Sequence, residues 1–310
     1  MEKILIGGKL SVSPVCLGAM NFGTTTSKEN AYAVLDAFVD AGGNFIDTSN
    51  NYAHWAGTGD ESETLLGEWM KERRNRDKLI IATKVGFDRH GKGAGLKKEQ
   101  IEYWINESLR KLQTDSVDLY YAHTDDADTP AEEAIETFNG LVKKGKVRVI
   151  GASNFDVWRL QDANNYALAN GLQPYQVNQQ RFTVLGTRGD AVPKYTFNEF
   201  TSRERLRFLA AKNIPLVAYS CLAKGGYEDP SRLPADLLTG KRYDAVKEIA
   251  AARGISASAV VVAFLTGLRD QPGMPVVIPL FASSRVDHFM ENLRGADVKL
   301  STEEMQLLLS

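Results

Sequence analysis

The stretch Leu79-Ile80-Ile81-Ala82-Thr83-Lys84 is a short apolar run that ends on a charged side chain. Residues 98–112 follow with apolar side chains at helical spacing, and residues 117–123 form a second apolar run that ends on His123. Runs of this length suit strands buried on both faces of a parallel sheet, and a period of three to four residues indicates an amphipathic helix. The stretch therefore predicts a strand–helix–strand unit, the repeat of an α/β fold.

The same alternation continues on both sides of this unit. The expected strands lie at residues 15–18, 44–47, 79–84, 117–123, 147–153, 175–178, 215–219 and 276–278. The expected helices lie at residues 28–41, 61–71, 98–112, 131–144, 156–170, 203–212, 244–253, 258–269 and 286–293.

Eight strand–helix pairs in 310 residues fit one (β/α)8 TIM barrel that occupies residues 1–310 as a single domain. An open doubly wound sheet is the alternative, but the first strand is not followed by a GxGxxG motif, which favours the barrel. Residues 3–13 carry two short runs around Gly7-Gly8 and predict an N-terminal β-hairpin at the bottom of the barrel.

Composition excludes several classes of protein. A net charge of -2 argues against a nucleic-acid binder, and no basic tract adjoins an apolar run, so a membrane role is not expected. Residues 1–8 lack the apolar core of a signal peptide. Cys16 and Cys221 lie in apolar contexts without a CxxC motif, and no His or Cys cluster has zinc spacing. We therefore expect a cytoplasmic protein with reduced, buried thiols and no metal.

Polar side chains end three neighbouring strands of the expected barrel, where barrel enzymes carry their chemistry. These side chains are Asp47, Lys84 and His123, and Tyr52 lies just beyond the first of them. Taken singly, each residue has an ordinary structural explanation. The aspartate could cap a turn, the lysine could lie at the surface, and the tyrosine and histidine could be structural. Together they predict an active site in which a lysine held by a carboxylate lowers the tyrosine pKa toward neutrality. Such a tyrosine suits a general acid for carbonyl reduction.

Seven segments, in order along nearly the whole chain, resemble the aldo-keto reductase superfamily. They are residues 43–52, 62–67, 82–85, 119–123, 150–155, 177–179 and 218–223. The resemblance implies a catalytic tetrad of Asp47, Tyr52, Lys84 and His123, with Tyr52 as proton donor. It also implies hydride transfer between NADP(H) or NAD(H) and a small-molecule carbonyl or alcohol substrate.

The resemblance further implies where the cofactor binds. The nicotinamide would stack on Tyr219, its carboxamide would contact Ser153, Asn154 and Gln179, and the other residues would follow the ribose, pyrophosphate and adenosine. The implied cofactor contacts are Gly18, Ala19, Met20, Asp47, Ser153, Asn154, Gln179, Tyr219, Ser220, Leu222, Ser283, Arg285, His288, Glu291 and Asn292.

The segment after the last strand departs from the family pattern. Two extra residues, Leu280-Phe281, follow Pro279, and Ala282 and His288 stand where basic residues often bind the 2′-phosphate of NADP. Arg285 is either a substitute phosphate contact or a solvated arginine at a helix start. NADP(H) is the family default, and NAD(H) stays open.

Two further segments concern the substrate. Residues 53–60 lengthen the connection after Tyr52, and Trp55 there either walls the substrate pocket or packs its own loop. Arg181 opens the long irregular segment 181–200, which also carries Tyr195 and Phe197. Long loops at a barrel mouth commonly carry specificity, so the expected substrate contacts are Tyr52, Trp55, His123 and Arg181. Aromatic and hydrogen-bonding groups together favour a sugar or other polar carbonyl compound.

The same sequence features are also compatible with a function other than catalysis. Some members of the superfamily are channel-associated subunits in which the cofactor acts as a sensor, so a cofactor-sensing binding protein with vestigial activity is the alternative. The complete tetrad favours the enzyme. The glycine-rich stretch 91–95 matches neither a P-loop nor a dinucleotide fingerprint and is interpreted as a loop.

Overall fold

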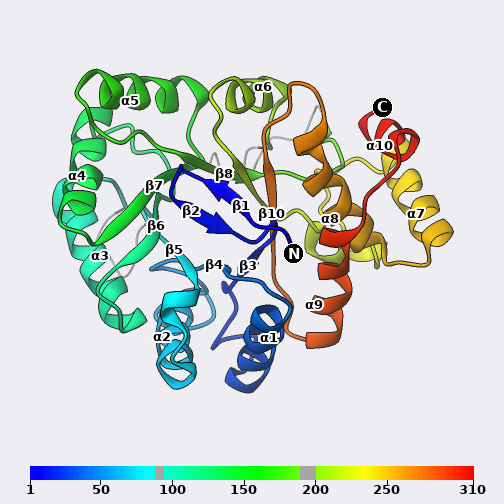
Figure 1. Cartoon of the computed structure of the whole chain (residues 1–310), viewed down its shortest axis with the longest axis horizontal. Helices are drawn as coiled ribbons and strands as arrows, with labels where there is room; N and C mark the ends of the chain where they lie inside the picture. Colours follow the sequence, from blue (N-terminus) through cyan, green and yellow to red (C-terminus); the bar gives the residue numbers. More distant parts are fainter. Residues whose placement is uncertain (88–93, 189–199) are drawn as a thin grey trace.

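A computed structural model of the chain describes residues 1–87, 94–188 and 200–310. Parallel strands close into a barrel in the order β10-β3-β4-β5-β6-β7-β8-β9, with helices around it (Figure 1). The eight barrel strands are β3 (Cys16–Gly18), β4 (Phe45–Asp47), β5 (Ile80–Val85), β6 (Val117–Ala122), β7 (Val147–Ser153), β8 (Val177–Arg181), β9 (Leu216–Tyr219) and β10 (Val277–Phe281). The closed order confirms the predicted (β/α)8 barrel and excludes the open sheet.

The helices form the outer layer, and their bounds lie close to the predicted ones. They are α1 (Lys28–Asp40), α2 (Glu61–Arg73), α3 (Lys98–Leu112), α4 (Ala131–Lys143), α5 (Val157–Ala169), α6 (Arg203–Ala211), α7 (Lys241–Arg253), α8 (Ala257–Gly267), α9 (Val286–Leu293) and α10 (Thr302–Leu309). Short 3-10 turns are η1 (Arg76–Lys78), η3 (Ala223–Gly225), η4 (Pro230–Arg232), η5 (Leu268–Asp270) and η6 (Arg294–Asp297).

Helix α10 is not among the predicted helices, although its start carries the capping pattern Ser301-x-x-Glu304. Ser301 caps its first turn in a reciprocal capping box with Glu304. The Glu304 carboxylate also accepts a 2.6 Å hydrogen bond from Arg253 Nε on α7. The helix is therefore held by its cap and by a contact from a distant part of the chain.

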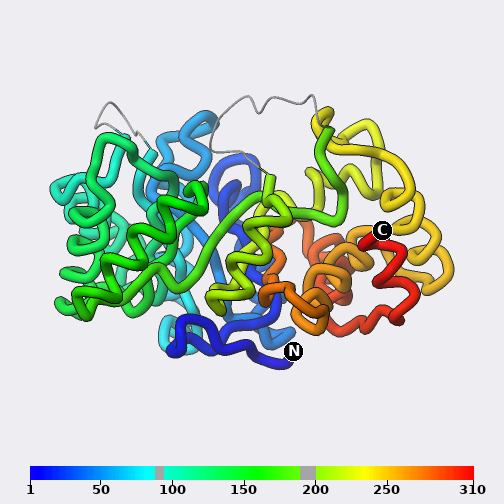
Figure 2. Tube along the Cα trace, turned by 90° about the horizontal axis from the view of Figure 1, so that it is seen from above, coloured from blue at the N-terminus to red at the C-terminus, as the bar shows by residue number. Residues whose placement is uncertain are grey.

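The N-terminal hairpin covers the end of the barrel where the strands begin. Strands β1 (Ile4–Ile6) and β2 (Leu10–Val12) pair antiparallel, and both turn glycines have positive φ. The hairpin lies across the barrel in Figure 1 and at one end of the molecule in Figure 2. Ile6, Leu10 and Val12 are buried in the inner core cluster. The predicted hairpin and its position are thus confirmed.

Strand β10 is longer than the sequence indicated. Leu280 and Phe281 pair with Cys16 and Leu17 of β3, so the two extra residues extend a strand and close the barrel. The predicted strand ends at residue 278, and proline, which follows it, lacks the N–H that a sheet ladder uses. Pro279 instead lies within β10, opposite Ala218 of β9.

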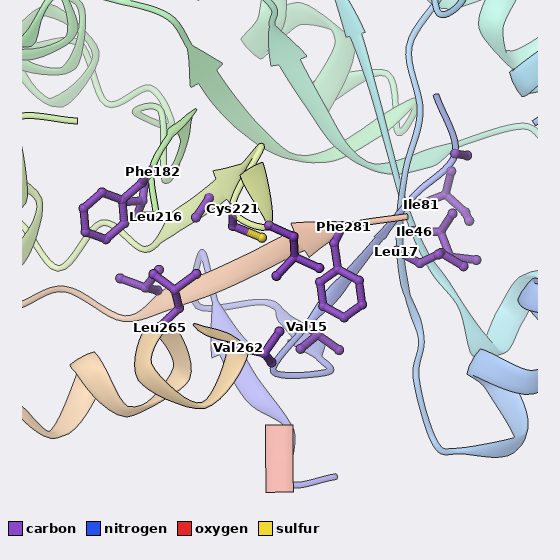
Figure 3. Packing of buried hydrophobic residues seen from close by; sticks show 14 of the residues in the cluster. Val15, Leu17, Ile46, Ile81, Phe182, Leu216, Cys221, Val262, Leu265 and Phe281 are labelled. Atoms are coloured by element: carbon purple, nitrogen blue, oxygen red, sulfur yellow. The ribbon is translucent and has the colours of Figure 1, made fainter. Parts of the chain in front are cut away.

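The core has two parts. A small cluster fills the barrel interior, and a larger one lies between the barrel and its helices. Figure 3 shows Val262 and Leu265 of α8 beside the strand that carries Phe281. Cys16 and Cys221 are free thiols, both buried.

No helix in the described ranges is by itself long and apolar enough to cross a membrane. The pair formed by residues 241–253 and 257–270 passes that test together by length and composition, with a bend of 106° at the break.

Candidate active site

A buried ion pair lies at the mouth of the barrel. Asp47 ends β4 and Lys84 lies near the end of the neighbouring β5, and both side chains are fully buried. The Lys84 ammonium donates to Asp47 Oδ1, to the Thr48 carbonyl oxygen at 2.7 Å and to Tyr52 Oη at 2.5 Å. Three acceptors match the three N–H groups of a charged lysine, so the cation is held in one position.

Tyr52 lies in the loop after β4, with its hydroxyl between both charges. Its Oη is 2.9 Å from Asp47 Oδ1, and Lys84 Nζ lies 4.4 Å from the ring centroid. Burial and then the Asp47 charge raise the pKa of Tyr52 well above its ordinary value. The prediction that Lys84 lowers this pKa is therefore wrong here, because burial and the Asp47 charge together outweigh the charge of Lys84. Tyr52 consequently carries its proton at neutral pH.

His123 follows β6 and faces the same region. Its ring lies 6.0 Å from that of Tyr52 and 4.6 Å from that of Phe87, edge to face in both cases. Burial and then the Lys84 charge lower the pKa of His123 well below its ordinary value. The imidazole is therefore neutral at pH 7. The structure thus brings all four residues of the predicted tetrad together.

Two neighbours of His123 were not predicted. Ser49 Oγ lies 3.2 Å from His123 Nδ1, and the Phe87 ring packs edge to face against the imidazole. Phe87 had a usable signal, since it is an aromatic residue two positions after the end of β5. Ser49 had a weaker one, as a hydroxyl within a buried polar run.

Residues predicted to hold the nicotinamide end the next strands. Tyr219 Oη donates to Asn154 Oδ1 at 2.8 Å. Asn154 Nδ2 donates to Ser153 Oγ at 3.0 Å and to the His123 carbonyl oxygen at 2.9 Å. Hydroxyl and amide groups here can both donate and accept, which is what recognition of a carboxamide requires. The half-buried ring of Tyr219 lies beside them, so this set fits a nicotinamide ring.

Gln179 connects these residues to the ion pair. Its Nε2 donates to Asp47 Oδ2 at 2.9 Å, leaving Asp47 Oδ1 for Lys84 and Tyr52. Every oxygen of the buried carboxylate therefore has a donor, as a buried charge requires.

The first strand contributes backbone to the mouth. Gly18 ends β3, and the Ala19 N–H donates to the Asp47 carbonyl oxygen at 2.9 Å. Met20 is exposed. Beyond β9, Ser220 adopts a left-handed backbone conformation and Leu222 is buried.

The last predicted cofactor segment surrounds the start of α9. The Arg285 guanidinium is exposed and pairs with Asp287, with Nε 3.0 Å from Oδ1, while the backbone N–H of Arg285 donates to Ser283 Oγ at 3.1 Å. His288 is exposed and Asn292 is half-buried. Arg285, one of the predicted cofactor contacts, is thus already paired with a carboxylate.

Glu291 has partners within the protein. Its Oε1 accepts from the Ser256 N–H at 3.2 Å, and Oε2 lies 3.1 Å from Arg294 Nη1. The residue therefore joins α9 to the start of α8.

The predicted substrate residues differ in exposure. Trp55 is 63% exposed, and its ring packs edge to face on His54 at 5.2 Å. Arg181 forms a two-pronged ion pair with Asp236, at 2.5 Å and 2.9 Å. Both interpretations of Trp55 stay open, and Arg181 has a structural partner in Asp236. Tyr195, Phe197 and residues 91–93 lie outside the described residues.

Comparisons with known proteins identify a family and several related enzymes. The sequence model of the Aldo/keto reductase family matches residues 14–310. Aldo-keto reductase ausK of Aspergillus calidoustus is 31% identical over 334 residues, covering 97% of this chain and 79% of that protein. Norsolorinic acid reductase stcV of Emericella nidulans is 31% identical over 323 residues, covering 96% and 77%. A putative aryl-alcohol dehydrogenase of Saccharomyces cerevisiae, AAD14, is 29% identical over 335 residues, covering 97% and 83%.

A solved structure of an aldo-keto reductase has a similar fold. The thermostable aldo-keto reductase Tm1743, crystallised with the inhibitor epalrestat, has 27% sequence identity and a TM-score of 0.77, covering 99% of this chain and 98% of that one. The family match spans nearly the entire chain, and the barrel brings the predicted polar residues to one mouth. This protein belongs to the aldo/keto reductase family.

Proposed function

We propose that this enzyme interconverts an aldehyde or ketone and its alcohol with NAD(P)(H), and that Tyr52 is its general acid and base. One observation carries the proposal. The Tyr52 hydroxyl lies 2.5 Å from the Lys84 ammonium and 2.9 Å from the Asp47 carboxylate, at the mouth of a family barrel. A phenol that is protonated at neutral pH and adjoins a fixed cation can give up its proton to a substrate oxygen.

Tyr52, Lys84 and Asp47 have separate roles in the proposed reaction. A nicotinamide held by these residues would supply the hydride chemistry, at the carbonyl carbon in reduction and at the alcohol carbon in oxidation. In reduction, the O–H bond of Tyr52 breaks as its proton passes to the carbonyl oxygen, and the phenolate that remains is stabilised by Lys84. Asp47 keeps Lys84 charged and in place, since a lone buried ammonium would be costly. A fixed charge directed at a developing phenolate needs no reorganisation during the reaction.

The cofactor site would be built from the strand ends next to the tetrad. Ser153, Asn154 and Gln179 would hold the carboxamide and Tyr219 the ring face. In the structure these side chains are hydrogen-bonded to one another and to Asp47, which holds their polar groups at the strand ends. Family members generally use nicotinamide cofactors, which supports this assignment.

Aromatic carbonyl compounds and aryl alcohols are the first substrate class to test. Phe87 packs edge to face against His123, and an aromatic side chain beside the reacting group suits a flat substrate ring. One relative is named an aryl-alcohol dehydrogenase, which points in the same direction. Sugars and other small polar carbonyl compounds form the second class, because polar side chains surround Tyr52.

The test pairs binding with turnover. NADPH and NADH are titrated against protein fluorescence, using the four tryptophans of the chain. Turnover is then measured on aromatic and sugar aldehydes and on their alcohols, for the wild type and Tyr52→Phe. We expect Tyr52→Phe to bind cofactor like the wild type but to lose about 100- to 10,000-fold in kcat/KM. Unchanged turnover in Tyr52→Phe refutes the role of Tyr52, and tight binding without any turnover favours a cofactor sensor.

A further inference from the structure

A positively charged groove lies at the end of the barrel where the strands begin, opposite the catalytic mouth. It has a volume of about 710 Å3 and adjoins the N-terminal hairpin, at the end of the molecule that Figure 2 shows with the hairpin. Five cationic side chains and two carboxylates line it, a formal net charge of +3 in a chain whose net charge is -2. These residues are Lys9, Arg74, Arg76, Asp77, Lys78, Asp118 and Arg148. Positive charge is therefore concentrated here against the overall sign of the protein.

Asp118 fixes two of the arginines side by side in this groove. It lies near the start of β6, and its side chain is 3% exposed. Asp118 Oδ2 is 2.9 Å from Arg76 Nη2, and Asp118 Oδ1 is 2.6 Å from Arg148 Nη1. The backbone N–H of Ile81 also donates to Asp118 Oδ2, at 3.0 Å. One buried carboxylate thus faces two guanidinium groups, which leaves an uncompensated positive charge in a fixed position.

Arg148 has N–H groups left for a ligand. Its Nη1 donates to Asp118, and its Nη2 lies 3.4 Å from the Lys9 carbonyl oxygen. A guanidinium has more N–H donors than these two contacts use, and the Arg148 side chain is 48% exposed. The planar fork of an arginine matches the oxygens of a phosphate. Arg148 is therefore held at one edge and open to an anion at the other.

Arg74 and Lys78 add two exposed charges to the groove. Arg74 caps the end of α2, and Lys78 ends η1. Throughout residues 1–87, 94–188 and 200–310, neither side chain forms an ion pair. A helix C-terminus attracts cations, which alone accounts for Arg74. It does not account for Lys9 in the hairpin turn or for Arg148 on β7, so the groove gathers cations from several unrelated elements.

We infer that this groove binds a small phosphorylated molecule that carries several negative charges. Its volume lies in the range of about 300–1,000 Å3 that is typical of small-ligand sites. Met70 and Leu79 also line it, and their apolar side chains suit an organic group attached to the phosphate. The positive charge is confined to one groove of a chain with net charge -2, which disfavours a nucleic acid. Because Tyr52 lies at the opposite end of the barrel, this site is independent of the proposed reaction.

Calorimetric titration of the cofactor-free protein with inorganic pyrophosphate tests the site. Low ionic strength is used, because salt screens exposed charges. We expect the wild type to bind pyrophosphate, and Arg74→Gln/Lys78→Gln to bind it about 5- to 20-fold more weakly, the scale of two exposed charged contacts. Glutamine suits the backbone of Arg74, since Gln113 caps α3 with the same left-handed φ of 52°. The double variant should therefore unfold at the same denaturant concentration as the wild type.

The matched control removes the same charge from another part of the surface. Lys241 begins α7 and Lys299 follows η6, and both are exposed. We expect Lys241→Gln/Lys299→Gln to bind pyrophosphate like the wild type. Equal losses in the two double variants would show attraction by net charge alone and would overturn the site.

Pyrophosphate can also enter a nucleotide site, so the titration is repeated with NADPH present. We expect the same affinity with and without NADPH. Loss of pyrophosphate binding in the presence of NADPH places the anion at the catalytic mouth and refutes the proposal, as does a wild type that binds no pyrophosphate. Tighter binding of a single-stranded oligonucleotide in this groove would replace the small ligand by a nucleic acid. If NADPH itself does not bind, the proposed function fails while the two double variants still test the groove.

Discussion

The Glu63 carboxylate and the Lys111 ammonium lie 2.6 Å apart, and their side chains are 0% and 2% exposed. Glu63 lies on α2 and Lys111 on α3, and Thr83 Oγ1 donates to Glu63 Oε1 at 2.6 Å. Thr83 directly precedes Lys84 in β5. This buried pair therefore fixes two helices against the strand that carries the catalytic-site lysine.

Lys111→Met should lower the free energy of unfolding by about 3–5 kcal/mol, because it leaves a buried carboxylate without its cation. Adding Glu63→Gln should recover much of that loss, since the uncharged amide still accepts from Thr83. Lys28 and Glu68 provide a matched control, with the same 2.6 Å separation but 52% and 44% exposure. Denaturant unfolding should show a loss below about 1 kcal/mol for Lys28→Met. Equal losses in the two lysine variants would contradict the importance of burial.

His123 should make stability depend on pH. Its pKa is lowered well below the ordinary value in the folded protein, by burial and then by the Lys84 charge. Below about pH 6.5 the unfolded chain takes up a proton that the folded protein does not. The stabilisation is therefore present above pH 6.5 and is lost as pH falls toward the folded pKa, by up to about 1.4 kcal/mol per pH unit.

His123→Gln should remove this contribution. The measurement is the free energy of unfolding of both proteins at several values between pH 5 and pH 8, chosen to span the ordinary histidine pKa of about 6.5. The variant should lose less stability on acidification than the wild type. Parallel pH curves would show that the folded pKa of His123 is close to 6.5.

Asp287 should limit the preference for NADPH. Arg285 is paired with Asp287, so a 2′-phosphate would have to compete with a carboxylate for the same guanidinium. Asp287→Asn should therefore raise the NADPH-to-NADH affinity ratio by about 3- to 10-fold, the scale of one exposed charged hydrogen bond. Fluorescence titration measures both affinities, and Arg285→Ala is the control. If Asp287→Asn raises the ratio equally with Arg285 absent, the carboxylate acts by simple repulsion.

Arg181 should act through Asp236 rather than on the substrate. Besides the ion pair, the Asp236 carbonyl oxygen accepts from the Arg188 N–H at 2.9 Å, and the Leu238 N–H donates to the Gly186 carbonyl oxygen at 2.9 Å. The pair thus joins two segments that run beside each other. Arg181→Met and Asp236→Asn should change stability and KM to a similar extent, and the double variant should add little. A rise in KM confined to Arg181→Met would restore its predicted role as a substrate contact.

The sequence was sufficient for the barrel and for the tetrad's location. Apolar runs such as residues 79–84 report burial directly, and parallel strands in a closed barrel end at one mouth. Asp47, Lys84 and His123 could therefore be placed together from their positions at the ends of neighbouring strands. Helix α10 was missed although Ser301 and Glu304 form a capping box that the sequence itself displays. The length of β10 could not be predicted, because strand pairing outweighed the local signal of Pro279.

The tertiary structure decided the chemistry of individual groups. The sequence indicated that Lys84 adjoins Tyr52, but the direction of the Tyr52 pKa depends on how burial and the Asp47 charge compare with Lys84. In the same way, the partner of Arg285 and the contact between Ser49 and His123 are matters of side-chain geometry. The hydrophobic pattern repeats along the chain and can be recognised from the sequence alone. Electrostatic and hydrogen-bond energies depend on distances of a few ångströms between residues far apart in sequence, and only the folded chain sets those distances.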